Sequence, residues 1–251
     1  TYYGDEICHV EGVPYAMHCV STVLRARANR IHLVHHPKFD VFDGGEYVFK
    51  TAPSTVHQHV LGRDWEPGSR VLEIGAGHGR LGLALSERGV NVVATDLHRP
   101  QQDFPFPYLA TNLDLQFATD VTEALGGKAE VVVALDVIEH LLRPEESLRE
   151  LRGAMEPGSR LVASTANIGY FLVRMMLMFG FFNYGKKGIL DLTHTRLFTI
   201  RSFCRTLEGE GFKVHGIRGF GPPIRDMIGS GLFLGFFDSV ASWLARVWPT
   251  L

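Results

Sequence analysis

Short apolar runs alternate with amphipathic stretches from residue 71 to residue 217. The runs predict buried strands, because a parallel sheet covered on both faces needs apolar side chains on each face. Between them, apolar residues spaced three and four apart predict helices, with Pro144 suited to a first turn and Thr199 to an N-cap. Leu148, Leu151 and Met155 form the apolar stripe of the helix after Pro144. The predicted strands are residues 71–74, 90–95, 108–111, 130–136, 160–165 and 212–217.

This order predicts an α/β fold with a doubly wound, mostly parallel, Rossmann-like sheet. Right-handed crossovers place the ligand crevice of such a sheet at the carboxyl ends of its strands. We assign residues 46–220 to this domain and residues 168–198 within it to an apolar lid insertion. Residues 1–45 are predicted to be a helical appendage and linker, with a helix over residues 14–27, and residues 221–251 an amphipathic helical segment.

A glycine-rich turn follows the first predicted strand, with the sequence EIGAGHGR at residues 73–80. A dinucleotide fingerprint needs glycine or alanine in place of Arg80, so that helix and strand can pack closely. A pyrophosphate would also be repelled by Glu73, whereas a ligand with an ammonium and a sulfonium group tolerates a carboxylate. Asp96 ends the second strand and can accept hydrogen bonds from both hydroxyls of a ribose. The alternative is an ordinary tight turn with a helix-capping aspartate.

Three stretches, EIGAGHG (73–79), ATD (94–96) and ALDVIEHL (134–141), together resemble the motifs of class I S-adenosylmethionine-dependent methyltransferases, especially the ubiquinone-biosynthesis-like group. The resemblance covers residues 50–220 and implies S-adenosylmethionine as the cofactor. It implies that the cofactor's amino group lies near Glu73 and its adenine near Asn112, for which Asp120 is a rival. The expected cofactor-binding residues are Glu73, Gly75, Ala76, Gly77, Gly79, Asp96, Leu97, Asn112, Leu113 and Asp136.

Two histidines are candidate bases. Methyl transfer from a sulfonium is an in-line displacement, so a base is needed only if the acceptor arrives protonated. His140 follows the fourth strand, and His194 lies in the loop GILDLTHTRLFT (188–199), which resembles a run found in many relatives. Alternatively, Glu139 and His140 only cap and anchor the next helix. For the loop, the separate alternative is that Asp191 and Arg196 form only a structural ion pair.

The loop over residues 188–199 is dense in hydrogen-bonding side chains, which is typical of a substrate lid. The expected substrate-binding residues are Tyr170, Asp191, Thr193 and Arg196.

An apolar stretch precedes this loop, with Arg174 as its one charge between residues 168 and 182. It is too short to span a bilayer but suits a lid or an interfacial helix, with Lys186 and Lys187 at the headgroups. A second such stretch lies near the C-terminus. Together they indicate a lipid-bearing substrate and peripheral contact with a membrane. Packing of the two on each other, or on a partner chain, is the alternative.

Composition and charge indicate which partners and which cellular compartment to expect. A net charge of -2 over 251 residues gives no electrostatic case for nucleic acid as a partner. Three widely spaced cysteines indicate a reducing compartment, so we predict a cytoplasmic protein, on the inner face of the membrane if it binds one. The twelve histidines form no metal-ligand pattern, and no metal is expected.

The N-terminal stretch over residues 1–27, which begins TYYGDEI, resembles the C-terminal tail of dolichyl-phosphate-mannose-synthase-like glycosyltransferases, in which a YYGDEI-like run recurs. This suggests an excerpt from a bifunctional chain with a covalently linked glycosyltransferase domain upstream. The leading hypothesis is therefore a methyltransferase that acts at oxygen on a sugar, a glycolipid or a lipid-linked intermediate. The alternatives are a quinone-type small-molecule O-methyltransferase and a non-catalytic cofactor-binding module that docks a glycosyltransferase.

Overall fold

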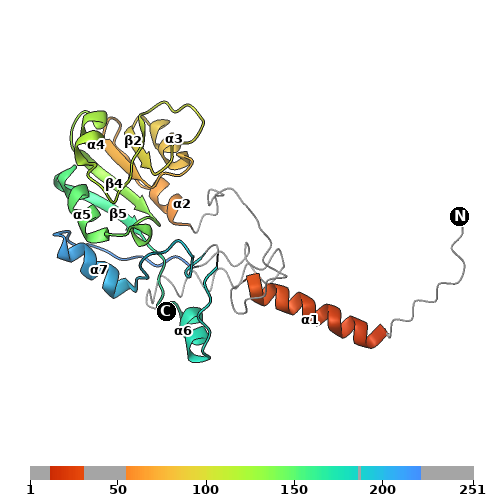
Figure 1. Cartoon of the computed structure of the whole chain (residues 1–251). Helices are drawn as coiled ribbons and strands as arrows, with labels where there is room; N and C mark the ends of the chain where they lie inside the picture. The colour runs from red at the N-terminus through yellow and green to blue at the C-terminus, as the bar shows by residue number, and fades with distance from the viewer. Residues whose placement is uncertain (1–11, 31–54, 186–187, 222–251) are drawn as a thin grey trace, which may run out of the picture.

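The protein is built around one parallel β-sheet (Figure 1). The computed structural model describes residues 12–30, 55–185 and 188–221. Five strands lie in the order β3-β2-β1-β4-β5, and every neighbouring pair is parallel. The predicted Rossmann-like fold is thus confirmed. The strands are β1 (Arg70–Ile74), β2 (Asn91–Asp96), β3 (Tyr108–Ala110), β4 (Ala129–Leu135) and β5 (Met155–Ser164).

Helices cover both faces of the sheet, which gives three layers (Figure 1). Alternate side chains of β1 show how the strands serve both faces: Leu72 packs in one core cluster and Val71 in the other. The first cluster includes side chains of α4 (Ala118–Leu125), α5 (Pro144–Gly153) and α7 (Ile200–Gly209). The second includes side chains of α2 (Val56–Leu61) and α3 (Arg80–Ser86).

Two sequence predictions about element boundaries were wrong. The helix after Pro144 ends at Gly153, and Met155 lies in β5 rather than in that helix. The strand begins five residues earlier than expected and includes Pro157 and Gly158. Residues 212–217 form no strand. Phe212 and Val214 pack against the core, as their alternation indicates, but an extended segment can bury alternate side chains without making ladder hydrogen bonds.

Two further helices lie outside the sheet layers. The N-terminal helix α1 (Gly12–Arg30) extends beyond the predicted 14–27, and its Met17, Val20 and Leu24 side chains are exposed. Helix α6 (Phe171–Met178) follows β5 and projects from the body of the domain (Figure 1). Within the described ranges, no helix is long and apolar enough to cross a membrane. The predicted C-terminal helical segment lies outside these ranges, as do residues 1–11.

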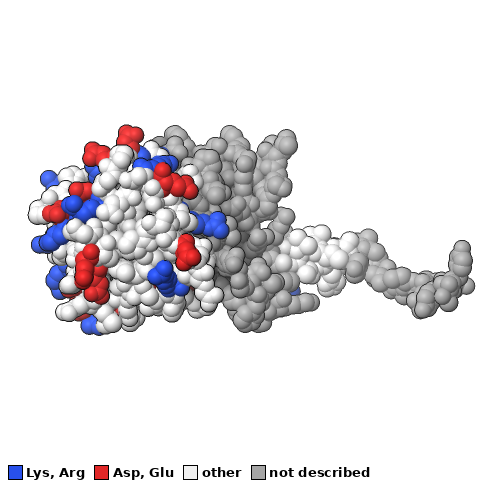
Figure 2. All heavy atoms as spheres, turned by 90° about the horizontal axis from the view of Figure 1, so that it is seen from above, with Lys and Arg blue, Asp and Glu red and all other residues white. Residues whose placement is uncertain are grey.

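Charged side chains are interspersed on the face that Figure 2 shows, without a continuous field of one sign. Exposed large apolar residues instead form one group on α6 and the segment that follows it, and a second group on α1.

Candidate functional site

The glycine-rich turn joins β1 to α3 at the carboxyl edge of the sheet. Gly75, Gly77 and Gly79 have φ angles of 65°, 54° and 65°, in the left-handed region where a side chain is strained. The amide of Ala76 donates to the carbonyl of Thr95 at 2.9 Å, which ties the turn to β2. Gly79 then serves as the N-cap of α3. The turn therefore has the tight backbone that the spacing of its glycines predicts.

Asp96 and Tyr108 hold the middle glycine from two sides. The Gly77 amide donates to Asp96 Oδ2 at 2.8 Å, and the Tyr108 hydroxyl donates to the Gly77 carbonyl at 2.7 Å. Burial, followed by the nearby charges of Asp96 and Glu73, raises the pKa of Tyr108, so its hydroxyl stays a donor at neutral pH. Sequence reasoning missed Tyr108, which begins β3 opposite Ala94, two residues before Asp96 on the neighbouring strand.

The open side of this turn fits the cofactor that the sequence implies. A Cβ added at Gly77 would meet nothing within 4 Å, so the backbone there faces free space. Asp96 Oδ1 has one long contact, with the His98 amide at 3.5 Å, and can accept from a ribose hydroxyl. The next side chain, Leu97, is 57% exposed and offers an apolar face beside that acid. These residues would hold the ribose and the base.

Glu73 lies beneath α3. Its side chain is buried, and a Cβ added at Gly82 would come within 2.9 Å of its Oε2 atom. Burial is the main reason that the pKa of Glu73 rises to about 8, opposed by a backbone hydrogen bond from Gly82 and reinforced by Asp96. A carboxyl group in this position is mostly neutral at pH 7 and contacts α3, so an orienting role toward the cofactor's amino group stays a prediction.

The residues expected around the adenine lie after β3. The Asn112 side chain accepts a hydrogen bond from the Asp114 amide at 3.0 Å, in a local turn. Leu113 is buried in the core cluster with Phe117, so most of its side chain already has neighbours. Asp120, the rival to Asn112, lies exposed in the first turn of α4, whose N-cap is Phe117.

Asp136 has a strained backbone where β4 ends. It has a φ of 54°, and among the described residues it is the one non-glycine with a positive φ. Ser164, at the end of β5, donates from its hydroxyl to Asp136 Oδ1 at 2.6 Å and accepts from the Asp136 amide at 3.0 Å. Since Val137 packs against Gly75, this strained residue is next to the glycine turn. Strain of this kind is often found at functional sites.

The two candidate bases lie side by side. The rings of His140 and His194 are 4.7 Å apart between centroids, at an angle of 70°. His140 follows β4 in a 3₁₀ turn (Ile138–His140), whereas His194 comes from the loop before α7. Burial is the main cause that lowers the pKa of His194, with His140 adding to it; the Ile189 carbonyl, Asp191 and Asp136 act in the opposite direction. The structure thus joins the two separate sequence candidates in one site.

Glu139 fixes the loop that carries His194. Its backbone carbonyl accepts hydrogen bonds from the amides of Thr195 and Arg196 at 2.9 and 3.1 Å. Its side chain is buried and accepts from the Ala166 amide at 3.0 Å, and burial, with Asp136 adding to it, raises its pKa. Glu139 therefore anchors two loops rather than the next helix alone, a role that its position in the sequence does not reveal.

The four residues expected to bind substrate separate into two groups. Asp191 and Thr193 adjoin the histidines, and Asp191 Oδ1 accepts from both the amide and the hydroxyl of Thr193 at 2.8 Å. Arg196 instead forms an ion pair with Glu145 in the first turn of α5. An ion pair for Arg196 was one alternative, but its partner is not Asp191. Tyr170 is the half-buried N-cap of α6, and burial raises the pKa of its hydroxyl.

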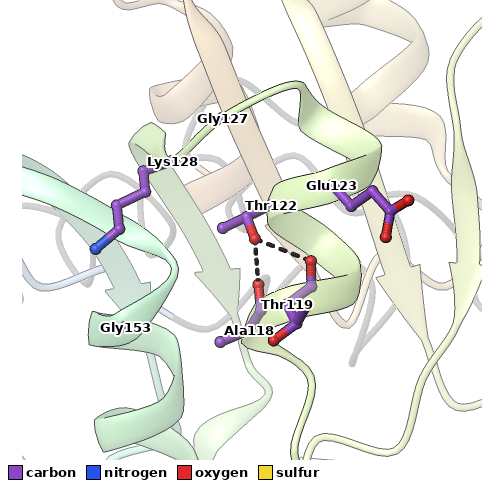
Figure 3. Close-up of a pocket in the computed structure, with 7 residues that line it drawn as sticks. All are labelled: Ala118, Thr119, Thr122, Glu123, Gly127, Lys128 and Gly153. Atoms are coloured by element: carbon purple, nitrogen blue, oxygen red, sulfur yellow. Dashed lines mark hydrogen bonds between the residues drawn. The ribbon is translucent and has the colours of Figure 1, made fainter.

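A shallow hollow lies at the opposite edge of the sheet (Figure 3). It lies beside Gly127 and Lys128, which directly precede β4, and Gly153, which ends α5. The one hydroxyl that Figure 3 shows bonded there, that of Thr122, donates to the carbonyls of its own helix. This hollow is at the amino edge of the strands, away from the groups described above, and we give it no role.

Comparison with known proteins identifies the family. A family model described as a methyltransferase domain matches residues 45–216, which is more than half of the chain. The protein therefore belongs to this methyltransferase family, and the enzyme is S-adenosylmethionine-dependent. A non-catalytic module is accordingly not supported.

Individual relatives agree with this assignment. The chain is 28% identical over 167 residues to the ubiquinone biosynthesis O-methyltransferase of Pseudomonas aeruginosa (strain UCBPP-PA14). The aligned region covers 64% of this chain and 68% of the relative. The enzyme of the same name from Aeromonas salmonicida (strain A449) is 27% identical over 159 residues, covering 61% and 66%. A solved S-adenosylmethionine-dependent methyltransferase from Archaeoglobus fulgidus has a TM-score of 0.51 at 18% identity, covering 76% of this chain and 88% of that one. This last likeness shows the fold.

Replacing Asp96 tests the proposed ribose contact. We expect Asp96→Asn to weaken binding of S-adenosylmethionine about tenfold, because an amide accepts through one oxygen and loses the charge-assisted hydrogen bond, a difference of about 1.4 kcal/mol. Calorimetric titration measures the dissociation constant. Asp103→Asn, an exposed carboxylate in the same β2–β3 connection, serves as the control. Equal affinities of the two variants would remove Asp96 from the site.

Proposed function

We propose that the protein transfers the methyl group of S-adenosylmethionine to a hydroxyl oxygen of an acceptor that carries an apolar chain. The observation that carries this proposal is the histidine pair, His140 and His194, at the strand edge that also holds the glycine turn. A hydroxyl is a poor nucleophile while it is protonated, so a base beside the transferred methyl group favours attack by oxygen. S-Adenosylmethionine supplies an electrophilic methyl group on a positively charged sulfur.

The chain's own residues would orient and deprotonate the acceptor. Asp136 lies at the end of β4, where its carboxylate contacts Ser164 and its electrostatic influence reaches His194. The loop over residues 191–196 is held in place by Glu139, so the histidines are presented by fixed backbone. Alignment of this kind supports an in-line displacement, for which positioning supplies much of the rate.

An apolar surface beside the site supports an acceptor with a lipid chain. We define it as the segment 171–184, and an isolated bridge between Gly185 and Asp191 joins its end to the histidine loop. No aspartate or glutamate occurs between Asn167 and Leu190, so nothing in this stretch repels an anionic lipid. Exposed apolar side chains gathered on one segment are typical of a surface that binds a partner or a membrane. Its exposed members are Phe171, Leu172, Leu177, Met178, Phe179, Phe181, Phe182 and Tyr184.

Two classes of acceptor satisfy these conditions. The first is a sugar hydroxyl of a glycolipid or lipid-linked intermediate, favoured by the resemblance of residues 1–27 to a glycosyltransferase tail. That resemblance and the linked glycosyltransferase domain stay predictions. The second is a polyprenyl phenol, favoured by the names of the Pseudomonas and Aeromonas relatives. In both, the apolar surface 171–184 would bind the lipid tail or the membrane that contains it. The proposed location is the cytoplasm, as the three widely spaced cysteines indicate, with peripheral contact of the apolar surface at the inner face of a membrane.

Transfer of labelled methyl to a panel of acceptors tests the proposal. The panel contains a polyprenyl phenol, a polyprenyl-linked sugar, a water-soluble phenol and a long-chain amine. Transfer to either tailed hydroxyl, with little to the amine, supports O-methylation and identifies the class. Transfer to the amine alone, with none to any hydroxyl, contradicts it.

The apolar surface has its own test. We expect the double variant Met178→Ser/Phe179→Ser, at positions 76% and 70% exposed, to raise KM for the tailed acceptor roughly tenfold. The value of kcat and the KM for a water-soluble phenol should stay unchanged, because both side chains are mostly exposed and a phenol without a tail does not need the apolar surface. Leu115→Ser, 60% exposed in the loop before α4, is the matched control. An unchanged KM for the tailed acceptor would remove the lipid tail from this surface.

A further inference from the structure

The geometry points to His140 as the proton acceptor of the pair, with Thr193 and Asp191 as the positioning residues that fix its tautomer and stabilise its charge. The proposal assigns separate roles to two histidines that the sequence could not tell apart, and it rests on the proposed O-methylation. It also gives Asp191 a role with Thr193, whereas Arg196 pairs with Glu145.

The first step concerns the Nδ1 atom of His140. It lies 3.2 Å from the Thr193 carbonyl oxygen and 3.0 Å from the Thr193 hydroxyl oxygen. A carbonyl oxygen can only accept, and the hydroxyl has a single proton, which it donates to Asp191 Oδ1 at 2.8 Å. Both neighbours therefore present lone pairs to Nδ1, so Nδ1 carries the proton. In the neutral ring the lone pair is then at Nε2, where it can take a proton.

The second step concerns charge. When Nε2 takes a proton, the ring becomes an imidazolium, and the Thr193 hydroxyl connects it to the Asp191 carboxylate. A carboxylate that holds an imidazole through its Nδ1 side favours the charged ring as well as its tautomer. Asp191 is itself held by the Thr193 amide, so the loop backbone fixes both partners of the ring.

His194 lacks a connection of this kind. Its Nδ1 lies 3.0 Å from the Ile189 carbonyl, which fixes the same tautomer but supplies no carboxylate. Burial and the neighbouring His140 both disfavour its charged form, although Asp191 and Asp136 act at longer range in its favour. Two rings 4.7 Å apart also disfavour double protonation, because like charges repel. Of the two rings, His140 is the one connected to a carboxylate through Thr193, so we assign the proton transfer to it.

The reaction step balances as follows. The O–H bond of the acceptor breaks and its proton passes to Nε2 of His140. The oxygen electron pair forms the bond to the methyl carbon while the bond from that carbon to sulfur breaks, and that electron pair stays on sulfur. The products are a methyl ether, a neutral thioether and an imidazolium, which carries the positive charge that the sulfonium had.

Nitrogen-15 NMR of the imidazole rings tests the hydrogen-bond chain without any turnover. His140→Gln and His194→Gln assign the two resonances by their loss. In the wild type above pH 8 we expect Nδ1–H for His140, and Thr193→Val should convert part of it to the Nε2–H form. Thr193→Ser keeps the hydroxyl and should retain the wild-type spectrum. An Nε2–H tautomer of His140 in the wild type would overturn the proposal.

A comparison of kcat between Thr193→Val and Thr193→Ser distinguishes positioning from general damage to the loop. We expect His140→Gln to lower kcat about 100-fold, and His194→Gln and Thr193→Val about tenfold. Asp191→Asn removes the carboxylate that the Thr193 hydroxyl reaches, so it should lower kcat about as much as Thr193→Val does. Thr193→Ser keeps the hydroxyl and should restore kcat.

Failure of this proposal is distinguishable from failure of the proposed function. If the wild type methylates no hydroxyl, O-methylation is wrong, and the NMR result alone decides on the hydrogen-bond chain. If hydroxyls are methylated, O-methylation stands. The assignment to His140 is then wrong if Thr193→Val has the same kcat as Thr193→Ser, or if His194→Gln lowers kcat more than His140→Gln does.

Discussion

Gly75→Ala is expected to lower the free energy of unfolding by about 3 to 5 kcal/mol, whereas Gly77→Ala, two residues away, lowers it by about 1 to 2 kcal/mol. Both glycines have a positive φ, so both substitutions introduce the backbone strain of a left-handed residue. The difference comes from the space around each Cβ. At Gly75 the new atom would overlap a methyl carbon of Val137, whereas at Gly77 it would meet nothing within 4 Å.

Urea denaturation followed by circular dichroism measures the free energies of unfolding of both variants. Titration with S-adenosylmethionine measures their affinity for the cofactor. Gly77→Ala should fold but bind S-adenosylmethionine at least tenfold more weakly, because its methyl group enters the space proposed for the cofactor. The double variant Gly75→Ala/Val137→Ala should recover part of the stability, since it removes the methyl groups that clash. Equal destabilisation by Gly75→Ala and Gly77→Ala would contradict the close approach of the turn to Val137.

The pattern of apolar residues predicted the sheet because each strand buries side chains on both faces. Val132 and Val133 of β4 show this directly, since neighbouring residues belong to opposite core clusters. The cap of α7 was equally readable: Thr199 accepts from the Ser202 amide at 3.2 Å, as its chemistry predicts. Local signals of this kind need no knowledge of distant contacts.

The errors have a different origin. The alternation over residues 212–217 reflects burial of Phe212 and Val214, but a strand also needs a neighbour whose backbone groups are in register. Met155 fits a helical stripe and a buried strand equally well, and only its pairing with Ala129 distinguishes them. Pairing depends on residues far away in the sequence, so periodicity alone could not decide either case.

The candidate site likewise combines local features, which the sequence predicts, with contacts between residues far apart in the sequence, which it does not. The glycine turn was predictable because its residues are consecutive, whereas the histidine pair joins residues that are more than fifty positions apart. Tyr108 gave no signal of its own, since it occupies an ordinary strand position and acts through a hydroxyl that reaches Gly77. The hydrogen bonds of Glu139 to Thr195 and Arg196 likewise depend on how two loops meet.

Glu73→Gln is expected to change how stability depends on pH. The pKa of this buried carboxyl is raised from its ordinary value of 4.5 to about 8, mainly by burial. Between these values the unfolded chain has lost the proton and the folded protein keeps it, so the free energy of unfolding falls as pH rises. The slope is at most about 1.4 kcal/mol per pH unit, and the total is at most about 5 kcal/mol by pH 8. The neutral amide of glutamine removes this contribution.

Denaturation in urea at pH 5, 6, 7 and 8 measures the slope, and the slope is the quantity to compare. Glutamine places an additional buried N–H beside Gly82, which costs about 1 to 3 kcal/mol at every pH and shifts the whole curve without tilting it. Glu87→Gln, an exposed carboxylate just after α3, removes the same charge and should keep the wild-type slope. Parallel curves for Glu73→Gln and the wild type would mean that Glu73 is ionised in the folded protein. The carboxylate beneath α3 would then be available to a cationic group of the cofactor, as the sequence first indicated.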